Sequence, residues 1–95
     1  MTRIVWTSIA RKSRQSIIDY IARENPKAAL DLGERIMARI RLLVTSPLQA
    51  RPGRVEGTRE LLVAGTPYLV IYAVEGETVT ILNVLHTRQK WPSDS

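Results

Sequence analysis

The sequence contains no cysteine and no phenylalanine, and its only histidine is His86. Without cysteine, disulfide bonds and thiolate metal sites are excluded, and a zinc site built on imidazoles would need further histidines. We therefore expect no metal and no cofactor. The absence of phenylalanine leaves isoleucine, leucine, valine and alanine to form most of the core.

Long hydrophobic runs are also missing. No stretch reaches the roughly 18 consecutive apolar residues of a membrane-spanning helix. The first residues, Met-Thr-Arg-Ile-Val-Trp, lack the apolar segment of a signal peptide. We therefore expect a cytoplasmic protein without a membrane partner.

Positive charge is in excess. The 95 residues include 14 lysines and arginines against 9 aspartates and glutamates, which gives a formal net charge of +5. Such a charge favours an acidic partner, either nucleic acid or an acidic protein, although solubility alone is the alternative explanation. At this length we expect a single domain, residues 1–95.

The start of the chain predicts a strand followed by a helix. Residues 3–6 are rich in β-branched and aromatic side chains, which favour a strand. Thr7 or Ser8 is a suitable N-cap for a helix over residues 9–23. The apolar positions expected on the inner face of this helix are Ile9, Ile17, Tyr20 and Ile21.

A second helix is predicted over residues 26–45. Pro26 suits a first helical turn and disfavours helix in the residue before it, so Asn25 ends the first helix and caps the second. Two helices joined so closely form an antiparallel hairpin. Gly33 lies in the helix interior, where close approach to the first helix would explain it. Residues 46–57 contain Pro52 and three further glycines or prolines, so they are expected to form a loop.

The last third predicts three strands, over residues 58–64, 67–75 and 78–86. The middle one is apolar on both faces, which is typical of a central strand covered on each side. Strict alternation in the last strand would place the following residues on one face: Thr80, Leu82, Val84 and His86. It would place the remaining residues on the other: Val79, Ile81, Asn83 and Leu85.

These elements predict an α+β fold of order β-α-α-β-β-β. The helical hairpin packs on one face of a mostly antiparallel four-stranded sheet. The C-terminal tail, residues 87–95, is expected to be irregular and to cover part of the opposite face. What it leaves uncovered would be an apolar surface that awaits a partner.

Six residues are candidates for binding a partner. Arg51, Arg54 and Arg59 lie before and at the strand over 58–64, and can bind phosphate or acidic side chains; a solvated loop is the alternative. The others are in the tail, where Trp91 either folds back over the sheet or, if exposed, stacks on a base or anchors a protein contact. The tail candidates are Arg88, Lys90 and Trp91.

The remaining basic residues and His86 have simpler interpretations beside functional ones. Arg35, Arg39 and Arg41 are interpreted as the polar face of the second helix. The first helix has a corresponding face, formed by Arg11, Lys12 and Arg14, where a partner could also pair with a basic ridge. His86 can act as a general acid or base, because its reference pKa lies near neutrality. It can equally be a strand-end residue hydrogen-bonded to the tail.

Seven short segments, in this order and spacing, carry a resemblance to a known family. They are residues 6–7, 19–22, 25–29, 53–54, 57–61, 67–72 and 81–86. Together they resemble the RelE/ParE superfamily of bacterial toxins, the toxic halves of type II toxin–antitoxin pairs. The resemblance implies a cytoplasmic toxin that arrests growth when it is free of its cognate antitoxin protein.

The superfamily has two activities, and three positions bear on which one the resemblance implies. RelE-like toxins cleave mRNA on the ribosome, whereas ParE-like toxins poison DNA gyrase. The nucleases carry an arginine after the first tyrosine of Tyr-x-x-x-Tyr, here Leu69, and lysines on the preceding strand, here Glu60 and Leu62. His86 falls where some nucleases have a catalytic histidine, but ParE-like members also end this strand in Val-Leu-His.

The resemblance therefore implies a ParE-like toxin that binds DNA gyrase and is not an enzyme. Two alternatives remain open. One is a RelE-like ribosome-dependent mRNA endoribonuclease, with His86 as acid or base and Arg54, Arg59 and Arg88 holding phosphates. The other is a non-toxic basic binding module that only regulates its operon with the antitoxin.

Overall fold

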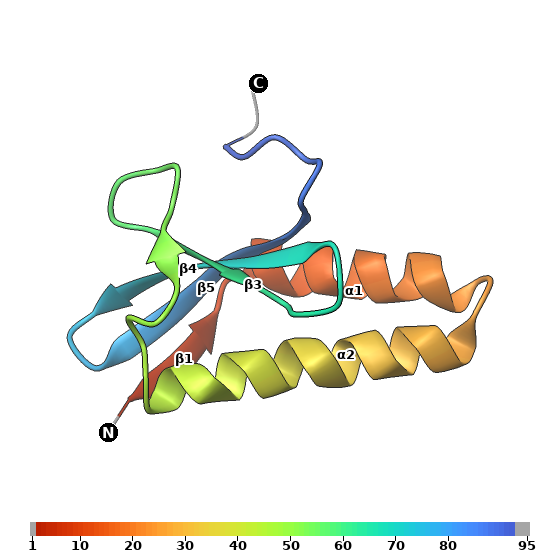
Figure 1. Cartoon of the computed structure of the whole chain (residues 1–95), viewed down its shortest axis with the longest axis horizontal. Helices are drawn as coiled ribbons and strands as arrows, with labels where there is room; N and C mark the ends of the chain where they lie inside the picture. Colours follow the sequence, from red (N-terminus) through yellow and green to blue (C-terminus); the bar gives the residue numbers. More distant parts are fainter. Residues whose placement is uncertain (1, 93–95) are drawn as a thin grey trace.

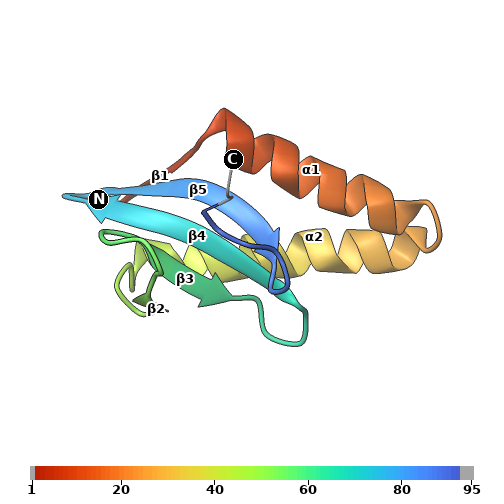
Figure 2. The ribbon, with the colours of Figure 1, turned by 90° about the horizontal axis from the view of Figure 1, so that it is seen from above.

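Two long helices lie side by side against a five-stranded mixed sheet in the computed structural model, which describes residues 2–92 (Figures 1 and 2). The sheet order is β1-β5-β4-β3-β2, with β1 parallel to β5 and the other neighbours antiparallel. The elements are β1 (Arg3–Trp6), α1 (Ser8–Ala22), α2 (Pro26–Arg41), the 3₁₀ helix η1 (Leu42–Val44), β2 (Arg51–Pro52), β3 (Arg59–Leu62), β4 (Tyr68–Glu75) and β5 (Thr78–His86).

The α+β class and the helical hairpin are confirmed, but the sheet has one strand more than the sequence predicts. Arg51 and Pro52 pair with Glu60 and Arg59, so part of the expected loop is strand β2. A strand of two residues, one of them proline, has no alternation of apolar and polar side chains. No local pattern therefore distinguishes it from a loop.

Both helices begin at the predicted caps. The hydroxyl oxygen of Thr7 accepts a hydrogen bond from the N–H of Ala10 at 3.0 Å, and the amide oxygen of Asn25 accepts one from the N–H of Ala28 at 3.0 Å. Each bond satisfies a backbone donor that the first turn leaves free. α2 ends at Arg41, four residues before the predicted end at 45, because the chain tightens there into η1.

The inner face of α1 agrees with the prediction only in part, because Ile17 and Ile21 pack against the main core but Ile9 and Tyr20 do not. Ile9 is 61% exposed and Tyr20 is 70% exposed, whereas Ala10 is fully buried. The cause is a long-range contact: the Thr7 hydroxyl donates to the carbonyl of Ile81 on β5 at 3.0 Å. This bond sets the rotation of the helix about its axis and turns the line through Ala10, rather than Ile9, toward the sheet.

Gly33 lies at the contact between the helices, where a Cβ atom would be 3.6 Å from Cδ1 of Ile18. That is an ordinary van der Waals distance, so the close approach leaves room for a methyl group. We expect Gly33→Ala to raise the free energy of unfolding by about 0.5–1 kcal/mol, the usual cost of glycine in a helix interior. Urea denaturation measures the change. A lower stability would show that the helices cannot accommodate the methyl group.

β4 is covered on both faces, as predicted for a central strand. Val70 and Tyr72 belong to the main core beneath the helices. Leu69 and Ile71 face the other way and form a smaller cluster against which the tail residue Trp91 packs. The tail therefore covers part of the second face, as expected; residues 93–95 of the predicted tail lie outside the described residues.

A β-bulge breaks the predicted alternation of β5. Ile71 pairs with Asn83 and Tyr72 with Ile81, which leaves Leu82 as an extra residue. One inserted residue shifts every later side chain to the opposite face. Val84 consequently joins the core beneath the helices, and Leu85 joins the cluster on the other face. The predicted grouping of Val84 with Leu82 is therefore wrong.

Candidate functional site

A buried carboxylate binds two of the predicted arginines. Glu60, 3% exposed on β3, accepts hydrogen bonds from Nη2 of Arg51 at 3.2 Å and from the backbone N–H of Arg54 at 2.9 Å. The carboxylate oxygen that accepts the Arg54 N–H, Oε2, also lies 3.3 Å from the Nε atom of Arg54, while Arg51 binds Oε1. Because both oxygens are paired, the buried charge is compensated. The Arg51 and Arg54 side chains remain 66% and 44% exposed, so each still offers donors at the surface.

Arg59, the third predicted arginine of this region, has a different set of contacts. Successive residues of a strand point to opposite faces, so Arg59 points away from its neighbour Glu60. Its guanidinium donates to the backbone carbonyls of Leu48 at 3.1 Å and Ala50 at 2.7 Å. These bonds hold the segment before β2 in place. The structure thus brings together Arg51 and Arg54, and separates Arg59 from them.

Tyr72 holds the same segment from the core. Its hydroxyl donates to the carbonyl of Pro47 at 2.7 Å. Burial raises the pKa of the Tyr72 hydroxyl, and the nearby charge of Arg59 acts in the opposite direction. The hydroxyl therefore stays protonated at neutral pH and remains a hydrogen-bond donor.

His86 lies at the end of β5 and is hydrogen-bonded to the tail. Its Nδ1 accepts the backbone N–H of Arg88 at 3.1 Å, and its backbone N–H donates to the side chain of Gln89 at 2.8 Å. The imidazole packs edge to face with Tyr68, with ring centroids 5.4 Å apart. The structure therefore confirms that His86 is a strand-end residue hydrogen-bonded to the tail.

The three candidate binding residues of the tail differ in their exposure to solvent. Trp91 is partly buried against the cluster of Leu69, Ile71 and Leu85, which confirms that it folds back over the sheet. Arg88 and Lys90 are exposed. Of the three tail candidates, the two cations are thus the exposed ones.

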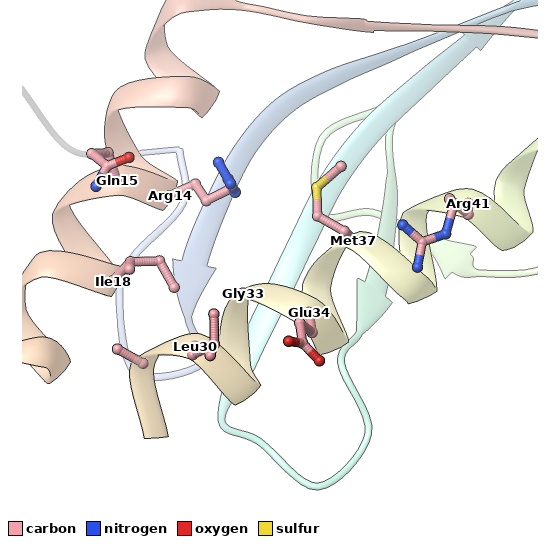
Figure 3. A pocket seen from close by; sticks show the side chains of 9 residues that line it. Arg14, Gln15, Ile18, Leu30, Gly33, Glu34, Met37 and Arg41 are labelled. Atoms are coloured by element: carbon pink, nitrogen blue, oxygen red, sulfur yellow. The ribbon is translucent and has the colours of Figure 1, made fainter. Parts of the chain in front are cut away.

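A groove of about 540 Å³ lies between α1 and α2. Figure 3 shows Arg14 and Ile18 on α1, and Leu30 and Met37 on α2, bordering it. Leu30 is 63% exposed. The full lining is Arg14, Gln15, Ile18, Ala29, Leu30, Gly33, Glu34, Met37 and Arg41.

A second pocket, of about 430 Å³, lies between α2 and the edge of the sheet at β3. It shares Arg51 and Glu60 with the arginine cluster, and α2 contributes Arg39. The full lining is Arg39, Gln49, Ala50, Arg51, Glu60, Leu61, Leu62, Leu69 and Thr87.

Arg14 and Arg39, interpreted from the sequence as residues of the polar helix faces, instead line the two pockets. Their Nε atoms are buried and lack a hydrogen-bond partner among the described residues. Arg14 also lies over the ring of Trp6, 5.7 Å from its centroid. Helical spacing contained a signal, because Arg14 is four residues from both Ala10 and Ile18 and so lies on the inner stripe of α1.

Two further properties of the described part of the chain concern membrane-spanning helices and metal-binding groups. No helix within residues 2–92 is long and apolar enough to cross a membrane. The same residues contain no group of three or more histidine, aspartate or glutamate side chains placed to hold a metal ion. The candidate sites are thus the two pockets, the arginine cluster and the tail.

Comparison with known proteins identifies the family. The family model of the ParE toxin of the type II toxin–antitoxin system parDE matches residues 4–91. A candidate toxin of Sinorhizobium fredii, Y4kP, is 39% identical over 90 residues, covering 95% of this chain and 93% of that protein.

Two solved structures share the fold. The chromosomal ParDE toxin–antitoxin system from P. aeruginosa contains a chain that is 26% identical, with a TM-score of 0.81, covering 90% of this chain and 96% of that one. YafQ from E. coli, 12% identical with a TM-score of 0.62, covers 90% and 93% of the two chains and is similar in fold alone. With a family model that spans nearly the whole sequence, this chain belongs to the ParE toxin family of type II toxin–antitoxin systems.

Proposed function

We propose that this chain is the toxin of a type II toxin–antitoxin module and arrests growth in the cytoplasm when it is free of its antitoxin. We further propose that it acts by binding DNA gyrase and does not cleave RNA. Membership of the ParE family and the similarity to a ParDE system support a toxin with an antitoxin partner. The ParE-like branch of the resemblance supports gyrase as the target.

The observation that carries this proposal is that Glu60 is buried and paired with two arginines. Metal-independent RNA cleavage requires cations that face the phosphate as charge develops. In the nucleases, the position of Glu60 is a lysine; here it is a buried carboxylate already bound by two arginines. Leu69, at the position of the nuclease arginine, is a buried member of the cluster against which Trp91 packs. These positions thus lack the cations that the reaction needs.

The remaining groups of the nuclease alternative have other partners. Arg54 binds Glu60, and Arg59 binds backbone carbonyls. The Nδ1 atom of His86 accepts a backbone hydrogen bond, so only Nε2 could exchange a proton with a substrate. Of the three proposed phosphate ligands, Arg54 and Arg88 are exposed, and Arg54 is already bound to Glu60.

Replacing His86 tests the proposal. We expect His86→Ala, expressed without antitoxin, to arrest growth as strongly as the unchanged chain, since the imidazole does no chemistry. Colony counts at matched protein levels measure the effect. His86→Gln, which keeps a hydrogen-bond acceptor near the tail, is the control for folding.

A loss of roughly 100-fold in toxicity in both folded variants, the usual contribution of a general acid or base, would favour the nuclease. An unchanged chain that is harmless at high expression would favour the non-toxic binding module instead.

The groove between α1 and α2 is our proposed antitoxin site. Leu30, Ile18 and Met37 supply an apolar surface, and an exposed apolar patch of this kind marks an interaction site. Arg14 and Arg41 outnumber Glu34, the one acidic residue of the lining. An amphipathic antitoxin segment with acidic side chains fits both properties.

A further inference from the structure

The two pockets lie on opposite sides of α2. Met37 and Arg41 line the groove toward α1, whereas Arg39, between them in sequence, lines the pocket toward β3. Residues two apart in a helix point in nearly opposite directions, which explains this division. A segment bound in the groove therefore does not occupy the second pocket.

Two arginines and one glutamate line the second pocket. Arg39 contributes a buried Nε atom without a partner among the described residues, and buried donors normally have an acceptor. Arg51 donates one hydrogen bond to Glu60, while its side chain is 66% exposed. Because a guanidinium has five N–H donors, Arg51 can bind a second acceptor. Glu60 is the only acidic residue of the lining and is already paired with two arginines.

The wall beside these arginines is apolar and partly open. β2 extends only as far as the pair Arg51–Glu60, so the next residues of β3 continue past the end of β2. Of these, Leu62 is 50% exposed, and Leu69 lies behind it, buried, on β4. A ligand that fits this pocket has a carboxylate beside an apolar side chain.

We propose that this pocket binds the protein on which the toxin acts. Arg39 and Arg51 hold the carboxylate of an aspartate or glutamate of the target, and Leu62 contacts an apolar side chain next to it. This inference depends on the proposed function as a toxin, but not on gyrase being the target.

Charge reversal in the pocket tests the inference. Arg39→Glu places a carboxylate where the target's carboxylate would bind, and Leu62→Asp places one where the target's apolar side chain would bind. We expect each to reduce growth arrest by roughly 100-fold in colony counts, while the Kd for the antitoxin changes by less than about 3-fold. Arg23→Glu, an equal charge change at an exposed residue after α1, is the matched control.

The variants are compared only after circular dichroism shows native secondary structure. If Arg39→Glu does not fold, Leu62→Asp still tests the pocket, because the substituted residue is exposed. Growth arrest equal to that of Arg23→Glu in both folded variants overturns the inference. A selective loss of antitoxin affinity would also overturn it, because the pocket would then bind the antitoxin. If the unchanged chain arrests growth without affecting gyrase, gyrase is not the target. The comparison of the pocket variants with Arg23→Glu still decides whether the pocket is needed for growth arrest.

If the unchanged chain does not arrest growth, titration of the pocket with a small peptide still tests the inference. The probe is N-acetyl-Leu-Asp-amide, with N-acetyl-Leu-Asn-amide as the uncharged control. We expect saturable changes in the NMR shifts of the Arg39 and Arg51 Nε–H groups with the aspartate peptide alone, at concentrations up to about 10 mM. No change, or equal changes with both peptides, would overturn the proposed carboxylate site.

Discussion

Glu60→Lys is expected to lower the free energy of unfolding by about 3–5 kcal/mol, the largest loss we expect from any single charge change in this chain. The substitution removes the carboxylate that pairs with Arg51 and Arg54 and places a third cation at a position that is 3% exposed. Urea denaturation at neutral pH measures the loss. The result matters for function because lysine is the residue that the nuclease branch carries here.

The matched control is Glu75→Lys, the same charge change at an exposed residue that ends β4. Surface substitutions of this kind usually change stability by less than about 0.5 kcal/mol. Equal losses in the two variants would show that Glu60 is not the centre of a compensated charge cluster. The structural argument against the nuclease would then lose its main support.

Leu30→Asp is expected to weaken antitoxin binding by roughly 30- to 100-fold, which is the effect of removing an interface hot spot. Leu30 is 63% exposed in the α1–α2 groove, so the substitution leaves the core intact. It replaces an apolar contact with a negative charge that repels an acidic antitoxin segment. Isothermal titration calorimetry with the cognate antitoxin measures the Kd.

Leu42→Asp serves as the control for that experiment. Leu42 is 47% exposed at the start of η1 and does not line the groove. We expect its Kd to stay within about 3-fold of the unchanged chain, as for a residue outside an interface. Equal weakening by the two variants, or none by Leu30→Asp, would place the antitoxin elsewhere on the toxin.

The parts of the fold that could be predicted are those encoded by local signals. The caps at Thr7 and Asn25, and the last strand over residues 78–86, were found because hydroxyl, amide and β-branched side chains act within a few residues. The rotation of α1 could not be found this way. It depends on a hydrogen bond from Thr7 to Ile81, a residue far away in the sequence.

The same distinction explains the two corrections in the sheet. The bulge at Leu82 arises from the pairing of β4 with β5, and β2 exists only because Arg51 meets Glu60 across the ladder. Neither residue differs from an ordinary strand or loop residue in its local sequence. Their conformations follow from partners that only the folded chain brings together.

At the candidate sites, residue type was easier to predict than residue role. The charge pattern indicated Arg51 and Arg54 as accessible cations, but not that a buried Glu60 binds both. Arg39 was interpreted as a solvated helix residue, whereas its Nε atom is buried in the wall of a pocket. An arginine beside buried positions of a helix has an apolar stem that packs and a head that needs a partner. The sequence alone does not show which partner it meets.

The most direct test of the proposed function is to add the purified chain to DNA gyrase and, separately, to translating ribosomes. We expect loss of DNA supercoiling by gyrase, and reporter mRNA that stays intact in the ribosome reaction. Addition of the antitoxin should restore supercoiling. Cleaved mRNA together with fully active gyrase would contradict the account and establish the nuclease alternative.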